Sequence, residues 1–157
     1  MIRMNKILSL LLIAAITITG CKKDDDCPPV EITAPATEVA SLKAYLDANS
    51  INATADSRGF FYTINTPGGG DKPTVCNYVN VAYTGKLTNG QTFDSNPGVG
   101  FSLSQVITGW QEAVPLLGSG GSMVLYLPPS LAYGSSAIQG IPANSMLIFT
   151  IDLQSFD

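Results

Sequence analysis

The chain has 157 residues, of which 45% are hydrophobic and 13% charged, and its formal net charge is −4. This length predicts one domain, the composition excludes a chain that is disordered throughout, and fifteen glycines with ten prolines favour a β-rich fold with many turns. Histidine is absent, which excludes Ser-His-Asp and Cys-His catalysis, histidine-ligated metals and imidazole acid–base chemistry, so we expect a reaction that needs no activated nucleophile, metal or cofactor.

Residues 1–20 have the pattern of a secretory signal peptide. Arg3 and Lys6 precede an apolar stretch, 7–18, which is shorter than the ~20 residues of a membrane-spanning helix. The final ITG and the following Cys21 resemble a bacterial lipobox, in which the cysteine is lipidated and becomes the mature N-terminus. At ~0.8 kcal/mol per buried CH₂, two or more acyl chains give a durable anchor. We therefore expect an exported lipoprotein, anchored in the outer membrane.

Residues 21–36 are expected to form a flexible lipidated tether. Removal of residues 1–20 leaves six basic and twelve acidic side chains, a net charge of −6, with no Lys/Arg cluster of the kind that nucleic acids need. The run KKDDD at 22–26 is either a solvated charged segment or, by its resemblance to known sorting signals, a signal for the cell surface. Both alternatives stay open, and with them the membrane face.

Residues 37–71 are expected to hold an accessory helix and a leading strand. Apolar residues recur at helical spacing from an N-cap at Thr37 to a stop at Asn49, so this helix either packs on the domain or extends the tether. From Gly59 the period changes to two, which predicts a strand with Phe60, Tyr62 and Ile64 on one face.

Residues 72–157 alternate in a way that predicts a sheet crossed by one short helix. Strands are expected at 75–84, 85–87, 91–93, 122–127 and 146–153, and the helix at 107–117. Asn89-Gly90 is a two-residue hairpin signal. Leu147, Phe149, Ile151 and Leu153 share the inward face of the last strand. The expected fold class is α+β, with a curved antiparallel sheet of about five strands.

Four segments of this second half carry a resemblance to a known family. They are VAYTGKLTNGQTFDS at 81–95, FSLSQVITGWQEAV at 101–114, LPPSLAYG at 127–134 and IPANSMLIFTIDL at 141–153. In this order they resemble the FK506-binding (FKBP-type) peptidyl-prolyl cis/trans isomerases, and within them the bacterial lipoprotein members. The resemblance covers about residues 72–154. It implies an FKBP-like isomerase domain at 72–157, with the N-terminal helix as an addition.

The resemblance also implies a hydrophobic pocket between sheet and helix. Trp110 would form its floor. The other substrate-binding residues would be Tyr83, Phe93, Phe101, Val106, Ile107 and Ile141. Catalytic roles would fall to Asp94, Tyr133 and Phe149, with the Tyr133 hydroxyl offered to a substrate carbonyl. Gln105 stands where the family often has an acid, and Thr108 replaces a frequent proline, which bears on substrate preference and macrolide affinity.

Several of these residues also fit a plain core. A single Trp on a short helix, and aromatics on inward strand faces, pack cores in many proteins, and Asp94 could accept a turn hydrogen bond. The convergence of five aromatics with Asp94 and Tyr133 favours a site. We predict a prolyl isomerase that acts on exported or cell-surface polypeptides, with macrolides as further ligands. The alternatives are a non-catalytic module that binds proline-containing partners, and a structural spacer.

Two cysteines remain after lipidation of Cys21. Cys27 and Cys76 are too few for a structural zinc site, and in an oxidising compartment they form either a disulfide or two free thiols. A disulfide would contribute ~4 kcal/mol on the chain-entropy model. The oligomeric state is left open.

Overall fold

The computed structural model describes residues 28–157. The predicted signal peptide, the lipidated Cys21, the start of the tether and Cys27 lie outside the described residues and stay predictions. Cys76 is exposed and disulfide-bonded. Because the two other cysteines of the chain fall outside the described part, its pairing with Cys27 also stays a prediction. Between residues 28 and 157, no helix is long and apolar enough to cross a membrane.

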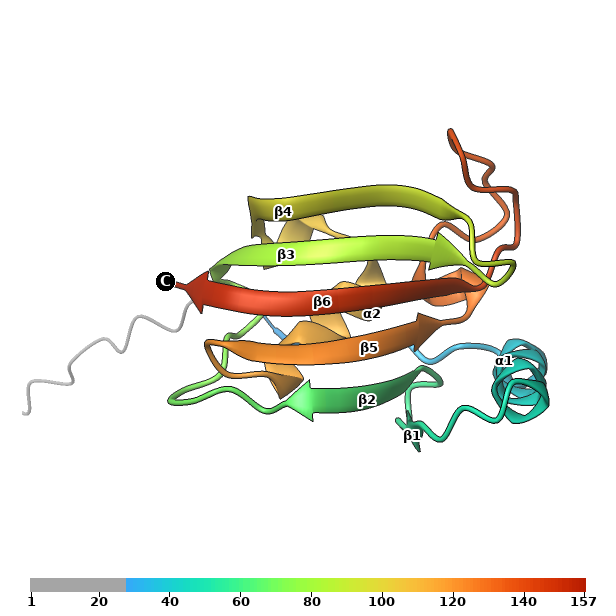
Figure 1. Ribbon diagram of the computed structural model, residues 1–157, viewed down its shortest axis with the longest axis horizontal. Coiled ribbons are helices and arrows are strands. Elements are labelled where there is room, and N and C mark those ends of the chain that lie inside the picture. The colour runs from blue at the N-terminus through green and yellow to red at the C-terminus, as the bar shows by residue number, and fades with distance from the viewer. Residues whose placement is uncertain (1–27) are drawn as a thin grey trace, which may run out of the picture.

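Within the described residues, one antiparallel sheet of six strands, in the order β1-β2-β5-β6-β3-β4, frames the domain (Figure 1). The strands are β1 (Thr54–Ala55), β2 (Phe61–Thr66), β3 (Tyr78–Leu87), β4 (Thr92–Ser102), β5 (Gly121–Leu127) and β6 (Leu147–Phe156). The α+β prediction is confirmed. The expected strands 75–84 and 85–87 form one continuous strand, β3, and β2 is the expected leading strand. The strand β1 was not expected, because its two residues are too few to show a period.

In the part of the chain that the structure describes, two α-helices accompany the sheet. The helix α2 (Thr108–Ala113) lies across one face, and α1 (Ala36–Ala48) lies beside the end of the sheet where β2 begins and β5 ends (Figure 1). Three 3₁₀ turns complete the described elements: η1 (Leu103–Gln105), η2 (Val114–Leu116) and η3 (Pro129–Leu131).

The boundaries of both helices differ from the expected ones. The helix α1 is capped by Pro35 and not by Thr37, which lies inside its first turn, whereas the stop at Asn49 is confirmed. The helix α2 is shorter than the predicted 107–117, and the chain continues as η2. Pro115 has no amide hydrogen and its ring crowds the carbonyl four residues earlier, so the α-helical ladder cannot pass through it.

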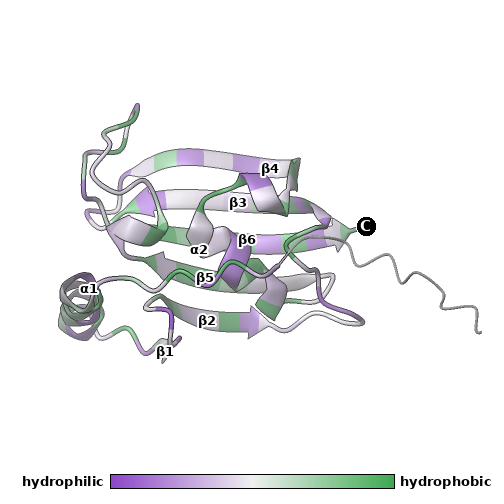
Figure 2. Ribbon diagram, turned by 180° about the vertical axis from the view of Figure 1, so that it is seen from behind, coloured by the Kyte–Doolittle hydropathy of each residue, from purple (hydrophilic) through white to green (hydrophobic). Residues whose placement is uncertain are grey.

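The main core fills the space between α2 and the facing side of the sheet. The predicted alternation in β6 is confirmed, since Leu147, Phe149, Ile151 and Leu153 are buried while Asp152 is exposed. Figure 2, which views the sheet from the α2 side, shows hydrophobic and hydrophilic residues in bands along the strands. Such banding is the mark of a sheet that buries one face and exposes the other.

A second, smaller core holds α1 against the domain. Leu42 and Leu46 are almost completely buried against Phe61 and Tyr126. Burial of each leucine stabilises this docking by about 1.5–3 kcal/mol. The helix α1 therefore packs on the domain and does not extend the tether. Of the three residues predicted to share one face of the leading strand, Phe60 and Tyr62 join the main core, whereas Ile64, farther along β2, is exposed.

The turn between β3 and β4 lies where Asn89-Gly90 predicts it, but its loop has three residues and not two. The amide of Leu87 donates to the carbonyl of Gln91, and that of Gly90 donates to the carbonyl of Leu87. Gly90 adopts φ 87°, a left-handed conformation that glycine accepts without strain. Beyond this turn β4 runs to Ser102, well past the expected strand at 91–93. The long β3–β4 pair is what carries several pocket residues.

Candidate active site

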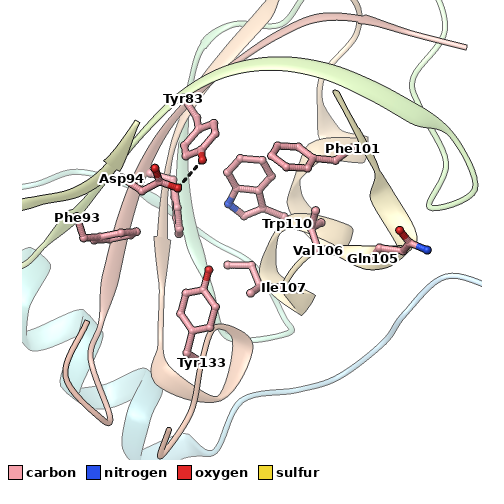
Figure 3. A pocket seen from close by; sticks show the side chains of 10 residues that line it. Tyr83, Phe93, Asp94, Phe101, Gln105, Val106, Ile107, Trp110 and Tyr133 are labelled. Atoms are coloured by element: carbon pink, nitrogen blue, oxygen red, sulfur yellow. Dashed lines mark hydrogen bonds between the residues drawn. The ribbon is translucent and has the colours of Figure 1, made fainter. Parts of the chain in front are cut away.

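A hollow of about 330 Å³ opens between α2, β3, β4 and the segment that follows β5 (Figure 3). Its size falls at the lower end of the range for small-molecule and peptide pockets. It is lined by Tyr83, Phe93, Asp94, Phe101, Gln105, Val106, Ile107, Trp110, Tyr133 and Phe149. Residues that are far apart in the sequence, from Tyr83 to Phe149, thus meet in one pocket.

An irregularity in β4 explains why Phe93 and its neighbour Asp94 both face the hollow. Adjacent residues of a regular strand point to opposite faces of the sheet. Here Gly85 pairs with Asp94 while the next residue, Lys86, pairs with Thr92, which leaves Phe93 as an extra, unpaired residue. Such a β-bulge bends the strand and turns side chains in a new direction. The bulge brings an aromatic ring and a carboxylate to the same pocket.

Trp110 on α2 forms the floor of the hollow and is 4% exposed. Its ring meets those of Tyr83, Phe149 and Phe101 edge to face, with centroid separations of 5.2, 5.3 and 6.0 Å. Edge-to-face pairs place the positive rim of one ring on the negative face of another, which fixes their orientation. The indole nitrogen is buried and has no hydrogen-bond acceptor among residues 28–157. The floor is therefore an aromatic surface shielded from water, with one unpaired N–H donor in it.

Phe93 and Phe149 form a further edge-to-face pair, at 5.6 Å, and this pair depends on a glycine. A Cβ atom at Gly85 would lie 2.5 Å from the Phe93 ring and 3.0 Å from the Phe149 ring. Both distances are shorter than ordinary contacts, so only glycine lets the rings lie directly on β3. The sequence does not point to Gly85, because nothing in its neighbourhood along the chain shows which rings cover it.

Three polar groups lie at the edge of this aromatic surface. The Tyr83 hydroxyl donates to Asp94 Oδ2 at 2.5 Å, and the Tyr133 hydroxyl points into the pocket (Figure 3). Burial, followed by the bond to Asp94, raises the pKa of Tyr83 to about 12. Burial and the Asp94 charge also raise the pKa of Tyr133. Both phenols therefore keep their protons at neutral pH, and each has a hydrogen to donate.

Nine of the ten residues predicted for the pocket line the hollow, and Ile141 does not. Ile141 is 4% exposed and belongs to the main core, in a bridge with Ile138 at the base of the loop before β6. Gln105 also lines the hollow, although the sequence indicates it only as a departure from the family pattern. Its position directly before Val106 and Ile107 is the one signal that could have pointed to it.

The model of the FKBP-type peptidyl-prolyl cis-trans isomerase family matches residues 69–154. The chain belongs to this family. It is 40% identical over 119 residues to the FKBP-type isomerase FkpA of Aeromonas hydrophila, and 42% identical over 100 residues to a probable FKBP-type isomerase of Haemophilus influenzae. These matches cover 72% and 60% of this chain, and 44% and 42% of the relatives. The chain thus spans less than half the length of these curated relatives.

Solved structures of FKBP-type and related isomerases share the fold. The crystal structure of FkpA from Escherichia coli superposes with a TM-score of 0.70 at 33% identity, over 78% of this chain and 60% of that one. A peptidyl-prolyl cis-trans isomerase from Pseudomonas syringae pv. tomato gives a TM-score of 0.68 at 28% identity, over 79% of this chain and 97% of that one. The FKBP-like fold expected from the four motifs is confirmed.

Proposed function

We propose that this chain catalyses cis/trans isomerisation of X-Pro peptide bonds in exported or cell-surface polypeptides, and so assists their folding. The observation that carries the proposal is the water-poor aromatic hollow over Trp110, rimmed by the hydroxyls of Tyr83 and Tyr133. Membership of the FKBP-type isomerase family supports it.

Prolyl isomerisation needs a site that removes water from the peptide bond, and it needs no nucleophile. Rotation about the peptide bond has a barrier of ~18–20 kcal/mol, because twisting removes the resonance between nitrogen and carbonyl. Resonance places negative charge on the oxygen of the planar amide, and water stabilises that charge. A site that replaces water by aromatic rings withdraws this stabilisation from the planar form and lowers the relative free energy of the twisted one. A concave surface that fits the twisted bond adds preferential binding of the transition state.

Each part of the site has a role in this scheme. Trp110 and Phe149, joined edge to face, receive the proline ring and exclude water from it. The Tyr133 hydroxyl donates to a substrate carbonyl and holds the peptide across the opening. Asp94 accepts the Tyr83 hydroxyl and so orients that ring on Trp110. We propose Asp94, Tyr133 and Phe149 as the catalytic residues.

Isomerisation of a short X-Pro peptide, followed by magnetisation exchange between its cis and trans forms, tests the proposal. The purified chain is expected to speed exchange well above background, and Phe149→Ala and Asp94→Ala to slow it. Asp152→Ala is the matched control for Asp94→Ala. It also removes a carboxylate, but from the exposed face of β6, which points away from the hollow. Absence of exchange above background, with peptide binding retained, would mean that the chain is a proline-binding module and not an enzyme.

We also propose that the isomerase works from a membrane anchor at Cys21. The motif ITGC and the apolar stretch before it support this location. Cells fed a radiolabelled or clickable palmitate are expected to label the wild-type chain and not Cys21→Ala. Equal labelling of both chains would rule out the anchor and would leave the proposed reaction unaffected.

We propose the hollow over Trp110 as the binding site for a macrolide of the FK506 type. A binding titration with the same preparation tests this.

A further inference from the structure

The helix α1 touches the segment that carries Tyr133, although it lies outside residues 69–154, which the family model matches. The carboxylate of Glu38, in the first turn of α1, accepts a hydrogen bond from the backbone amide of Ser130 at 2.8 Å. The two residues are 92 positions apart in the chain. A bond to an ionised acceptor is stronger than one between neutral groups, and here it joins a helix to a turn.

The segment that receives this bond is a compact unit that ends on Tyr133. Ser130 lies in η3, and the carbonyl of Pro129 accepts hydrogen bonds from the amides of Ala132 and Gly134 at 2.9 and 2.8 Å. Tyr133 therefore lies inside a stretch whose two ends are bonded together. A shift of η3 moves the Tyr133 side chain with it. The amide of Ser130, at the start of the turn, has no carbonyl within η3 to bond, and Glu38 supplies the missing acceptor.

The other end of this link is firmly held. The helix α1 buries Leu42 and Leu46 in the second core, against Phe61 of β2 and Tyr126 of β5. Tyr126 precedes η3 by three residues, so helix, strand and turn meet at the same end of the sheet. Glu38 itself is half-buried, which limits the positions its carboxylate can take. The link thus connects a packed helix to a turn whose only role in the pocket is to present Tyr133.

We propose that Glu38 is a positioning residue for Tyr133, and that α1 is in this way part of the isomerase site. The inference rests on the proposed function of the pocket. Glu38 touches no substrate. It acts by holding η3 so that the Tyr133 hydroxyl points into the hollow, where Figure 3 shows it.

The test is a double-mutant cycle on the full chain in mild detergent. Glu38→Ala is expected to lower kcat/KM for a short X-Pro peptide about tenfold, the factor that corresponds to the lower end of the net strength of a hydrogen bond to a charged group. In a Tyr133→Phe background, which lacks the hydroxyl to be positioned, Glu38→Ala is expected to have no further effect. Glu38→Gln keeps an oxygen acceptor and is expected to restore most of the activity.

A matched control and a second readout make the outcome unambiguous. Asp47→Ala breaks the exposed Lys43–Asp47 ion pair on the same helix and is expected to leave kcat/KM unchanged. Amide hydrogen exchange needs no catalysis, and Glu38→Ala is expected to speed exchange at Ser130 and through residues 131–134. Additive losses in the cycle, or unchanged exchange there, overturn the positioning role. If the wild-type chain has no isomerase activity, but Glu38→Ala still speeds amide exchange at these residues, the proposed function is refuted and the structural link is supported.

Discussion

Replacing Gly85 by alanine perturbs the pocket from beneath, without removing any of its side chains. The new Cβ would lie 2.5 Å from Phe93 Cζ and 3.0 Å from Phe149 Cε1, where ordinary contacts begin at 3.4 Å. Gly85 does not have a left-handed φ, so the backbone itself accepts alanine. Overpacking of this kind destabilises by about 1–3 kcal/mol. Alanine in a strand is favoured over glycine by about 0.5–1 kcal/mol, which offsets part of this cost, so we expect a net loss in the free energy of unfolding of up to ~2.5 kcal/mol.

Urea unfolding measures the stability of Gly85→Ala, and the peptide exchange assay measures its activity. Because both rings must move outward, toward the space where the proline binds, we expect kcat/KM to fall by about ten- to a hundredfold. Gly69→Ala is the matched control, since a Cβ there meets no atom within 4 Å and its φ is not left-handed. The free energy of unfolding of Gly69→Ala should stay within about 0.5 kcal/mol of the wild-type value. Wild-type stability and activity in Gly85→Ala would refute the direct packing of Phe93 and Phe149 on β3.

Three further predictions concern groups around the site and core. Burial raises the pKa of Glu112, which is 2% exposed and accepts the Ile32 amide, so its folded form holds a proton more tightly than the unfolded form. The stability it contributes is present below the unfolded pKa of about 4.5 and is lost as pH rises through the raised folded pKa. Glu112→Gln should abolish that fall in stability, measured by urea unfolding across this pH window. In an absorbance titration, the Tyr83 phenol should ionise at a pH of about 12, and Tyr83→Phe should lack this late step. Leu42→Ala should destabilise by about 2–5 kcal/mol, because the leucine is fully buried between α1 and the sheet.

Each of these has an outcome that contradicts it. Parallel pH profiles for the wild type and Glu112→Gln would mean that burial does not shift this carboxyl. A late ionisation that survives in Tyr83→Phe belongs to another tyrosine. Lys43→Ala is the control for Leu42→Ala, because Lys43 is exposed on the same helix, and equal small losses for the two would show that α1 is not docked.

The sequence alone determined the parts of this protein whose signal is local or rests on ordered motifs. The alternation from Leu147 to Leu153 predicts a strand with one buried face, and Asn89-Gly90 predicts a turn, because both follow from backbone geometry over a few residues. The end of α1 at Asn49 is equally local. Four motifs in the family order were enough to predict the FKBP-like fold and nine of the residues that line the hollow.

Tertiary structure alone decided how side chains face one another between distant elements. Phe61 lies out of phase with the predicted core face and is buried because α1 covers it. Phe93 faces the hollow because it is the unpaired residue of a bulge, while Ile141 lies in the core and not in the pocket. The contact between Glu38 and Ser130 joins residues 92 positions apart. Strand register and helix docking depend on residues brought together only by folding, and a bulge reverses the alternation without leaving a mark in the neighbouring sequence.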